Sequence, residues 1–137
     1  MPNIPADTPS GTPQLRKLGI VPGARWSVVG ADPGWTFELA PDAGAQVAAS
    51  TPADVVVAFA RTAAELAAQL DANEQRIFPA GALWIAWPRK AAGHVSELGD
   101  ALVRETGLAR EHLVDTKVAA LDHDWSALKF VWRREFR

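Results

Sequence analysis

The chain has 137 residues and a net charge of -2, with 48% hydrophobic and 22% charged residues. This length and composition predict one soluble globular domain, and the near-neutral charge excludes long-range attraction to a nucleic-acid backbone. The absence of cysteine excludes disulfides, thiolate nucleophiles and cysteine-based zinc sites, and it fits a cytoplasmic protein. No apolar run approaches the ~20 residues of a membrane-spanning helix, so no membrane partner is expected.

The N-terminal residues 1–11 contain three prolines among small polar residues, which predicts a flexible lead. Residues 12–137 are then predicted to form a single α/β domain. Thr12 and Pro13 are typical of a helix start, and Gly19 is typical of a helix end, so a short helix is expected between them. Residues 25–30 (RWSVVG) are predicted to form the first strand.

The interval from residue 31 to residue 53 is too short for two complete crossovers, each of which needs at least ~10 to 12 residues. We therefore expect one short helix or turn near residues 35–40 and one short strand near residues 45–50.

Two almost wholly apolar runs, residues 54–60 and 83–87, are typical of strands that are buried on both faces. Between them, Thr62 and Glu65 have the spacing of a capping box, and an apolar stripe predicts that the helix continues to Phe78. A strand, helix and strand in this order form a right-handed crossover between parallel strands in nearly all known cases. This unit is expected to organise the fold.

Ser96 is predicted to cap a helix that runs to about Glu105, with Gly107 at its C-terminal end. Residues 113–121 then form a strand, the run from Asp122 to Asp124 favours a tight turn, and residues 127–133 alternate as an antiparallel final strand. The predicted fold class is α/β, a three-layer sandwich whose mostly parallel sheet has about six strands and an antiparallel last strand.

Parallel strands end on one edge of a sheet, and ligands of open α/β sheets bind at that edge. We call this edge the rim. A cationic loop beside indole faces could hold a planar or anionic ligand there, although polar loops above a tryptophan-rich core would give the same pattern. The rim candidates are Asp32, Arg61, Arg89, Lys90, His94, His123, Asp124 and Ser126, flanked by Trp35, Trp87 and Trp125.

The run of Asp122, His123 and Asp124 is suggestive of a metal site, but three consecutive residues rarely chelate one ion, and no metal is expected. Lys129 interrupts an apolar strand, so its ammonium group needs either a partner such as Asp122 or Asp124 or exposure to solvent, and we expect a structural salt bridge first. The other three tryptophans, which are Trp26, Trp84 and Trp132, are expected in the core.

Four motifs carry a family resemblance: KLGIVPGARW, VGADPGW, PAGALWIAWPRK and LDHDWSALKFV. With these motifs the chain resembles the bacterial family called domain of unknown function 3052, from about residue 12 to residue 131, and that family brings no established reaction. The second half of that family in turn resembles class I S-adenosylmethionine methyltransferases, and this resemblance implies a shortened Rossmann-like fold. This second resemblance implies cofactor contacts at Gly30, Asp32, Gly34, Trp35, Arg89 and Lys90.

Two departures from the methyltransferase pattern shape the functional expectation. Pro33 stands in the loop where those enzymes carry donor glycines, and residues 45–51 offer no carboxylate for a ribose. The leading hypothesis is therefore a non-catalytic domain without a cofactor, which binds a partner protein or a small ligand at the rim. The alternative is an S-adenosylmethionine- or nucleotide-dependent transferase with a degenerate cofactor loop. A third possibility is a homodimer formed through the exposed face of the helix predicted at residues 62–78.

Overall fold

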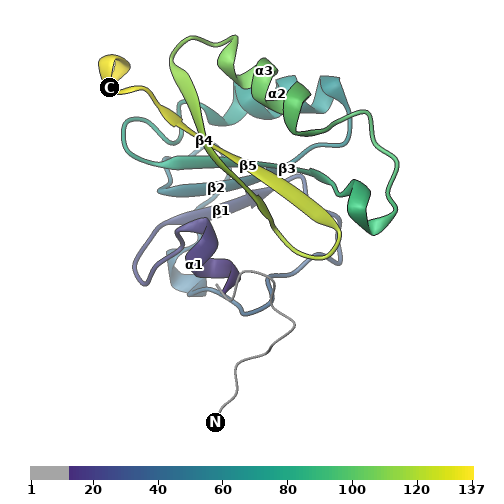
Figure 1. The fold of residues 1–137 in the computed structure, drawn as a ribbon. Coiled ribbons are helices and arrows are strands. Elements are labelled where there is room, and N and C mark those ends of the chain that lie inside the picture. The colour runs from purple at the N-terminus through teal and green to yellow at the C-terminus, as the bar shows by residue number, and fades with distance from the viewer. Residues whose placement is uncertain (1–12) are drawn as a thin grey trace.

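The computed structural model describes residues 13–137, so the predicted flexible lead lies outside the described residues. A five-stranded mixed sheet forms the centre, with helices on both faces (Figure 1). The strand order is β1-β2-β3-β5-β4. The strands are β1 (Trp26–Val29), β2 (Val55–Phe59), β3 (Ala82–Pro88), β4 (Leu113–Ala120) and β5 (Trp125–Trp132).

The expected mostly parallel sheet of six strands is wrong. The sheet has five strands, and only the pairs β1–β2 and β2–β3 are parallel, whereas β3–β5 and β5–β4 are antiparallel. The parallel crossover from β2 to β3 and the antiparallel direction of the last strand are confirmed. The sixth strand was expected at residues 45–50, which contribute only one bridge, between Trp26 and Gln46. Ser50 has a positive φ of 75°, and Arg76 binds the carbonyl oxygens of Ala48 and Thr51, so the chain turns away from the sheet.

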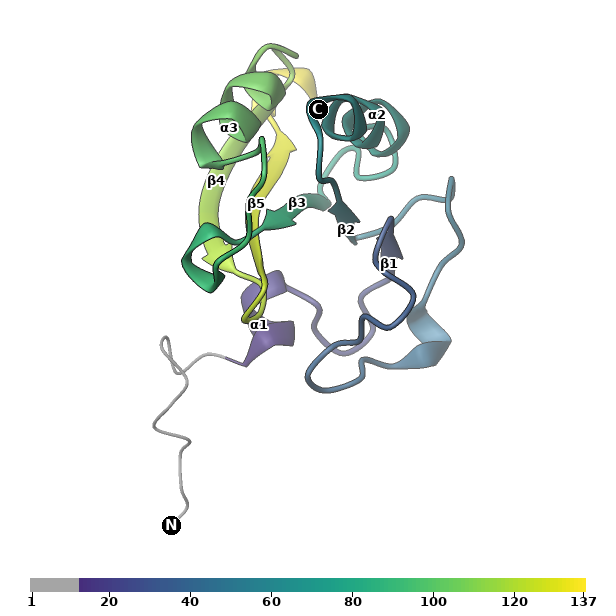
Figure 2. The same ribbon diagram turned by 90° about the vertical axis from the view of Figure 1, so that its right-hand side faces the viewer.

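Helices α2 (Ala63–Asn73) and α3 (Asp100–Leu108) cover one face of the sheet. The short helix α1 (Gln14–Leu18) and the segment 31–53 lie on the other face, as the view in Figure 2 shows. Each face has its own buried cluster because strand side chains alternate between the two sides. Trp84 is fully buried on the α1 face, where its Nε1 donates to the carbonyl oxygen of Leu18.

The start of α2 is confirmed, and its end is not. Thr62 accepts a hydrogen bond from the Glu65 amide at 3.1 Å, and the Glu65 carboxylate accepts one from the Arg61 amide at 2.7 Å. The helix ends at Asn73 rather than near Phe78. Beyond it, Arg76 donates from its amide to Asn73 O and from its guanidinium to Asn73 Oδ1, which tightens the chain into turns.

The predictions for both ends of the next helix, α3, are wrong. Helix α3 begins after Gly99 rather than after Ser96, and Gly107 lies inside it instead of ending it. A Cβ at Gly107 would overlap the ring of Phe130, so this glycine allows α3 to pack closely on β5.

Among residues 13–137, the helices lack the combination of length and apolarity that a membrane span requires.

Near residues 35–40, where a helix or turn is expected, the chain forms no helix and follows a tight turn in which the Trp35 amide donates to Asp32 O. Trp35 and Phe37 are both half-buried and pack toward the sheet, an alternation that suits an extended chain. Short 3-10 turns occur elsewhere, at η1 (Ala43–Ala45), η2 (Lys90–Ala92) and η3 (Arg134–Phe136).

Candidate functional site

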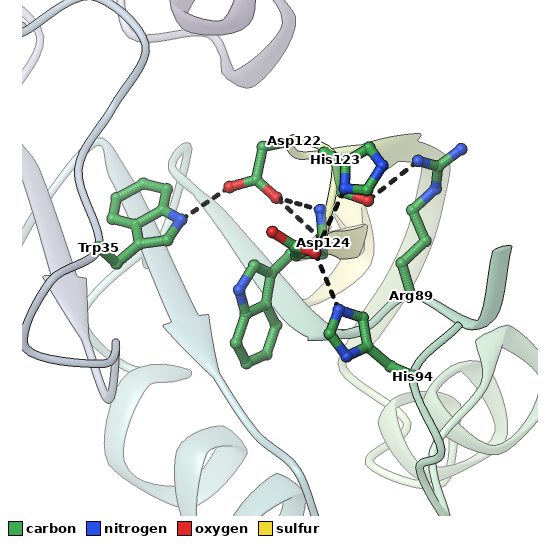
Figure 3. Close-up of polar contacts among 7 residues, drawn as sticks. Trp35, Arg89, His94, Asp122, His123 and Asp124 are labelled. Atoms are coloured by element: carbon green, nitrogen blue, oxygen red, sulfur yellow. Dashed lines mark hydrogen bonds and ion pairs between the residues drawn. The ribbon is translucent and has the colours of Figure 1, made fainter. Parts of the chain in front are cut away.

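Four segments meet at the edge that we call the rim, namely the loops after β1, β2 and β3 and the turn between β4 and β5. Since β3 and β4 both run antiparallel to β5, β4 ends at the same edge as β1, β2 and β3. The turn between β4 and β5 therefore lies beside the loops that follow β1 and β3 (Figure 3).

Asp122 holds the centre of this edge. Its Oδ1 accepts hydrogen bonds from the amides of Asp124 and Trp125, both at 2.9 Å, which fixes the β4–β5 turn. Its Oδ2 accepts a hydrogen bond from Trp35 Nε1 at 2.9 Å (Figure 3). One carboxylate thus fastens the loop after β1 to the closing hairpin.

Asp124 fastens the loop after β3 to the same turn. Its Oδ1 lies 2.9 Å from His94 Nε2 and 3.3 Å from His123 Nδ1 (Figure 3). These hydrogen bonds, first from His94 and then from His123, hold the pKa of Asp124 below its ordinary value. Arg89 adds a backbone bond to Asp124 O and a guanidinium bond to His123 O. Within residues 13–137, no group of three or more metal-ligating side chains is arranged to hold an ion.

Arg61 links the loop after β2 to the rim. Its guanidinium pairs with Asp32 at 2.5 Å and lies 4.8 Å from the centre of the Trp125 ring. Trp125 is only 7% exposed and Trp87 only 4%, so both indoles belong to the core. Of the three indoles proposed as ligand platforms, Trp35 is the one that remains half-buried.

Gly30 was a candidate for cofactor contact, but the structure explains this glycine without a ligand. Its φ is +78°, and a Cβ there would lie 2.5 Å from Gln69 Nε2 and 2.9 Å from Phe59 O. Gln69 donates from this nitrogen to Phe59 O at 3.0 Å. A side chain of α2 therefore occupies the space beside the glycine backbone. At Gly34, by contrast, a Cβ would meet nothing within 4 Å.

The other predicted residues lie apart from these contacts. Lys90 is exposed in η2, with its ammonium group near Gly99, and Ser126 lies in β5 between Trp87 and Ala120. The predicted salt bridge of Lys129 to Asp122 or Asp124 is wrong. Lys129 lies in mid-strand opposite Trp84, away from the turn.

An apolar groove that the sequence did not predict lies where the rim meets the edge strand β1. Its volume is about 350 Å³. Both indole N–H groups in its walls are already bonded, Trp26 to Asp42 O at 2.9 Å and Trp35 to Asp122. Phe37 packs edge-on against both rings. The lining residues are Trp26, Val28, Ala31, Trp35, Thr36, Phe37, Ala40, Pro41, Ala43 and Gln46.

One sequence signal could have indicated this groove. Trp35 and Phe37 are two apart, after a predicted strand end, in a segment otherwise made of small and polar residues. Two large aromatics at that spacing favour an extended chain with one apolar side.

Comparisons with family models, with curated proteins and with solved structures find no match for this chain.

Proposed function

We propose that this chain is a binding domain without a catalytic role, and that it takes a small, flat, apolar ligand in the groove at the β1 corner of the rim. The observation that carries the proposal is the groove itself, whose walls are indole and phenyl rings with no free indole donor. Such walls offer stacking surfaces and little hydrogen bonding, so they favour an aromatic or similarly flat molecule.

The dimensions and rigidity of the groove support this ligand class. A volume of about 350 Å³ falls in the range of small-molecule sites, roughly 300 to 1,000 Å³. The bonds of Trp26 to Asp42 and of Trp35 to Asp122 hold both indoles in place before a ligand arrives. A preformed site loses less conformational entropy on binding, which raises affinity.

The charged residues of the rim support binding rather than catalysis. Arg61 pairs with Asp32, His94 pairs with Asp124, and Arg89 donates to the turn. These groups already bond to other groups of the rim and join its loops, whereas a general base has to reach a substrate proton. Gln69 beside Gly30 likewise makes a cofactor-dependent transferase the less supported alternative.

The surface of α2 gives little support to the homodimer. None of the large hydrophobic residues exposed on the described chain lies between Ala63 and Asn73, and within the predicted range 62–78 only Phe78 is one of them. A small ligand is therefore the occupant that the described residues favour.

A fragment screen by saturation-transfer NMR tests the proposal. Flat aromatic fragments should bind the native protein and should be lost on Ala43→Phe, which places a ring in the groove. The matched control is Ala49→Phe, an exposed alanine of the same segment that does not line the groove. Fragments that bind all three proteins equally, or an absence of any binding fragment, would contradict the proposed function.

A further inference from the structure

Two lysines lie directly opposite each other on the face of the sheet that carries α1. Lys117 of β4 pairs in register with Lys129 of β5, and Lys129 pairs with Trp84 of β3. Both ammonium groups lie over the same indole, with Nζ 5.9 Å and 6.0 Å from the Trp84 ring centre. The two lysines are therefore direct neighbours on this face of the sheet.

Neither lysine forms an ion pair with a carboxylate of the described residues. The ion pairs among residues 13–137 use arginine or histidine as the cation, and neither Lys117 nor Lys129 takes part in one. Like charges directly opposite on neighbouring strands destabilise a sheet. Burial, and then the charge of Lys117, lower the pKa of Lys129. The fold thus tolerates an unfavourable pair.

The pair can be reached from solvent. Helix α1 bonds to this hairpin near its rim end, where Gln14 donates to Leu121 O and Lys17 donates to Ala120 O. Three residues before Ala120, Lys117 is exposed, and Lys129 beside it is half-buried. An anion can therefore approach both ammonium groups from one side.

We propose that Lys117 and Lys129 form an anion site that binds a small dianionic ligand, a phosphate or a dicarboxylate, across β4 and β5. Two ammonium groups supply two positive charges and up to six donors, which match the charge and the acceptors of such an oxyanion. The bound anion would replace the repulsion between the lysines with two attractions. This site is separate from the apolar groove and does not depend on the function proposed for it.

The test measures melting temperature against inorganic phosphate, and in a second arm against succinate, with chloride keeping the ionic strength constant. The proteins are the native chain, Lys117→Met, Lys129→Met and the control Lys90→Met, an exposed lysine outside the pair. At ten times its dissociation constant, a bound anion should raise the melting temperature of the native chain and of Lys90→Met by about 4 to 6 °C. Both variants of the pair should lose this rise.

The melting temperatures of the variants in the absence of an anion distinguish a ligand site from a structural role. Without an anion, Lys129→Met should melt above the native chain because the repulsion is gone, although it no longer responds to phosphate. A merely structural lysine would instead lower the melting temperature when replaced. The proposal is overturned if neither anion stabilises the native chain, or if the anions stabilise all four proteins equally. Stabilisation by phosphate alone would assign a phosphate ligand, and equal stabilisation by succinate would assign the wider dianion class.

Discussion

At the scale of single residues, Gly30 shows how an internal contact can imitate a ligand signature. A glycine at the end of the first strand resembles the start of a cofactor loop, yet its missing side chain makes room for Gln69 and Phe59 O. The positive φ of 78° adds a second reason for glycine, because other residues are strained there.

We expect Gly30→Ala to lower the free energy of unfolding by roughly 2 to 4 kcal/mol, since it combines a left-handed backbone with an overlap in a packed site. Urea denaturation measures the effect. Gly34→Ala is the matched control, and it should change stability by less than about 0.5 kcal/mol because its Cβ meets nothing. Equal effects at the two glycines would refute this account of Gly30.

The Glu74 carboxylate contacts two basic side chains at the end of the sheet opposite the rim. It pairs with Arg110 at 2.6 Å and with His112, and its side chain is only 14% exposed. Trp132 donates to its carbonyl oxygen at 2.8 Å, so the end of α2, the start of β4 and the end of β5 meet there.

Glu74→Gln should destabilise the fold by roughly 1 to 3 kcal/mol, because Arg110 and His112 lose a charged acceptor while Arg110 keeps its ion pair with Asp71. Thermal unfolding with a calorimetric enthalpy checks this value. Glu111→Gln, an exposed neighbour, should be nearly neutral. A neutral Glu74→Gln would show that the pair contributes nothing net.

At the scale of elements, local signals predicted the start of α2 but not its end. The capping contact of Thr62 with Glu65 is local, and it is present. The early end of α2 depends on Arg76 reaching Ala48 and Thr51, which are distant in the sequence. The expected strand at residues 45–50 failed for the same reason. Contacts of this kind leave no periodicity to detect.

The hairpin of β4 and β5 carries a pH-dependent prediction. Burial and Lys117 lower the folded-state pKa of Lys129 from its ordinary value of 10.5. Well below that lowered pKa, both the folded and the unfolded chain carry the proton, and the cost of the charge is fully present. As pH rises through the lowered pKa toward 10.5, the folded chain releases its proton first and stability increases.

We therefore expect the free energy of unfolding of the native chain to increase relative to that of Lys129→Met as pH rises toward 10.5. Chemical denaturation over this alkaline window, at constant ionic strength, measures the difference. Parallel stability curves for the two proteins would contradict the lowered pKa.

At the scale of the whole molecule, the order and direction of the strands predict the rim, but they do not predict the groove. Strands that end at one edge bring Asp32, Arg61, Arg89 and Asp124 together wherever the loops are short, so the residue types and their edge could be inferred. The groove depends on how residues 35–46 fold back along β1, which no crossover rule specifies. The sheet has five strands rather than the expected six because this segment pairs with β1 through a single bridge.

The paired rim also predicts the response to S-adenosylmethionine. A ligand at a hundred times its dissociation constant adds about 2.7 kcal/mol of stability. With Gln69 beside Gly30 and Asp32 bound to Arg61, we expect no shift in melting temperature at millimolar S-adenosylmethionine. A saturable rise that Asp32→Asn abolishes would instead support the transferase alternative.

The most direct test of the groove is a two-dimensional amide spectrum recorded while a flat aromatic fragment is titrated into the protein. A fragment bound in the groove should produce saturable shifts at the amides of Val28, Ala31 and Phe37 and at the indole N–H of Trp35, with the amides around His94 and Asp124 unchanged. Shifts centred on His94 and Asp124, or spread evenly over the surface, would contradict binding in the groove.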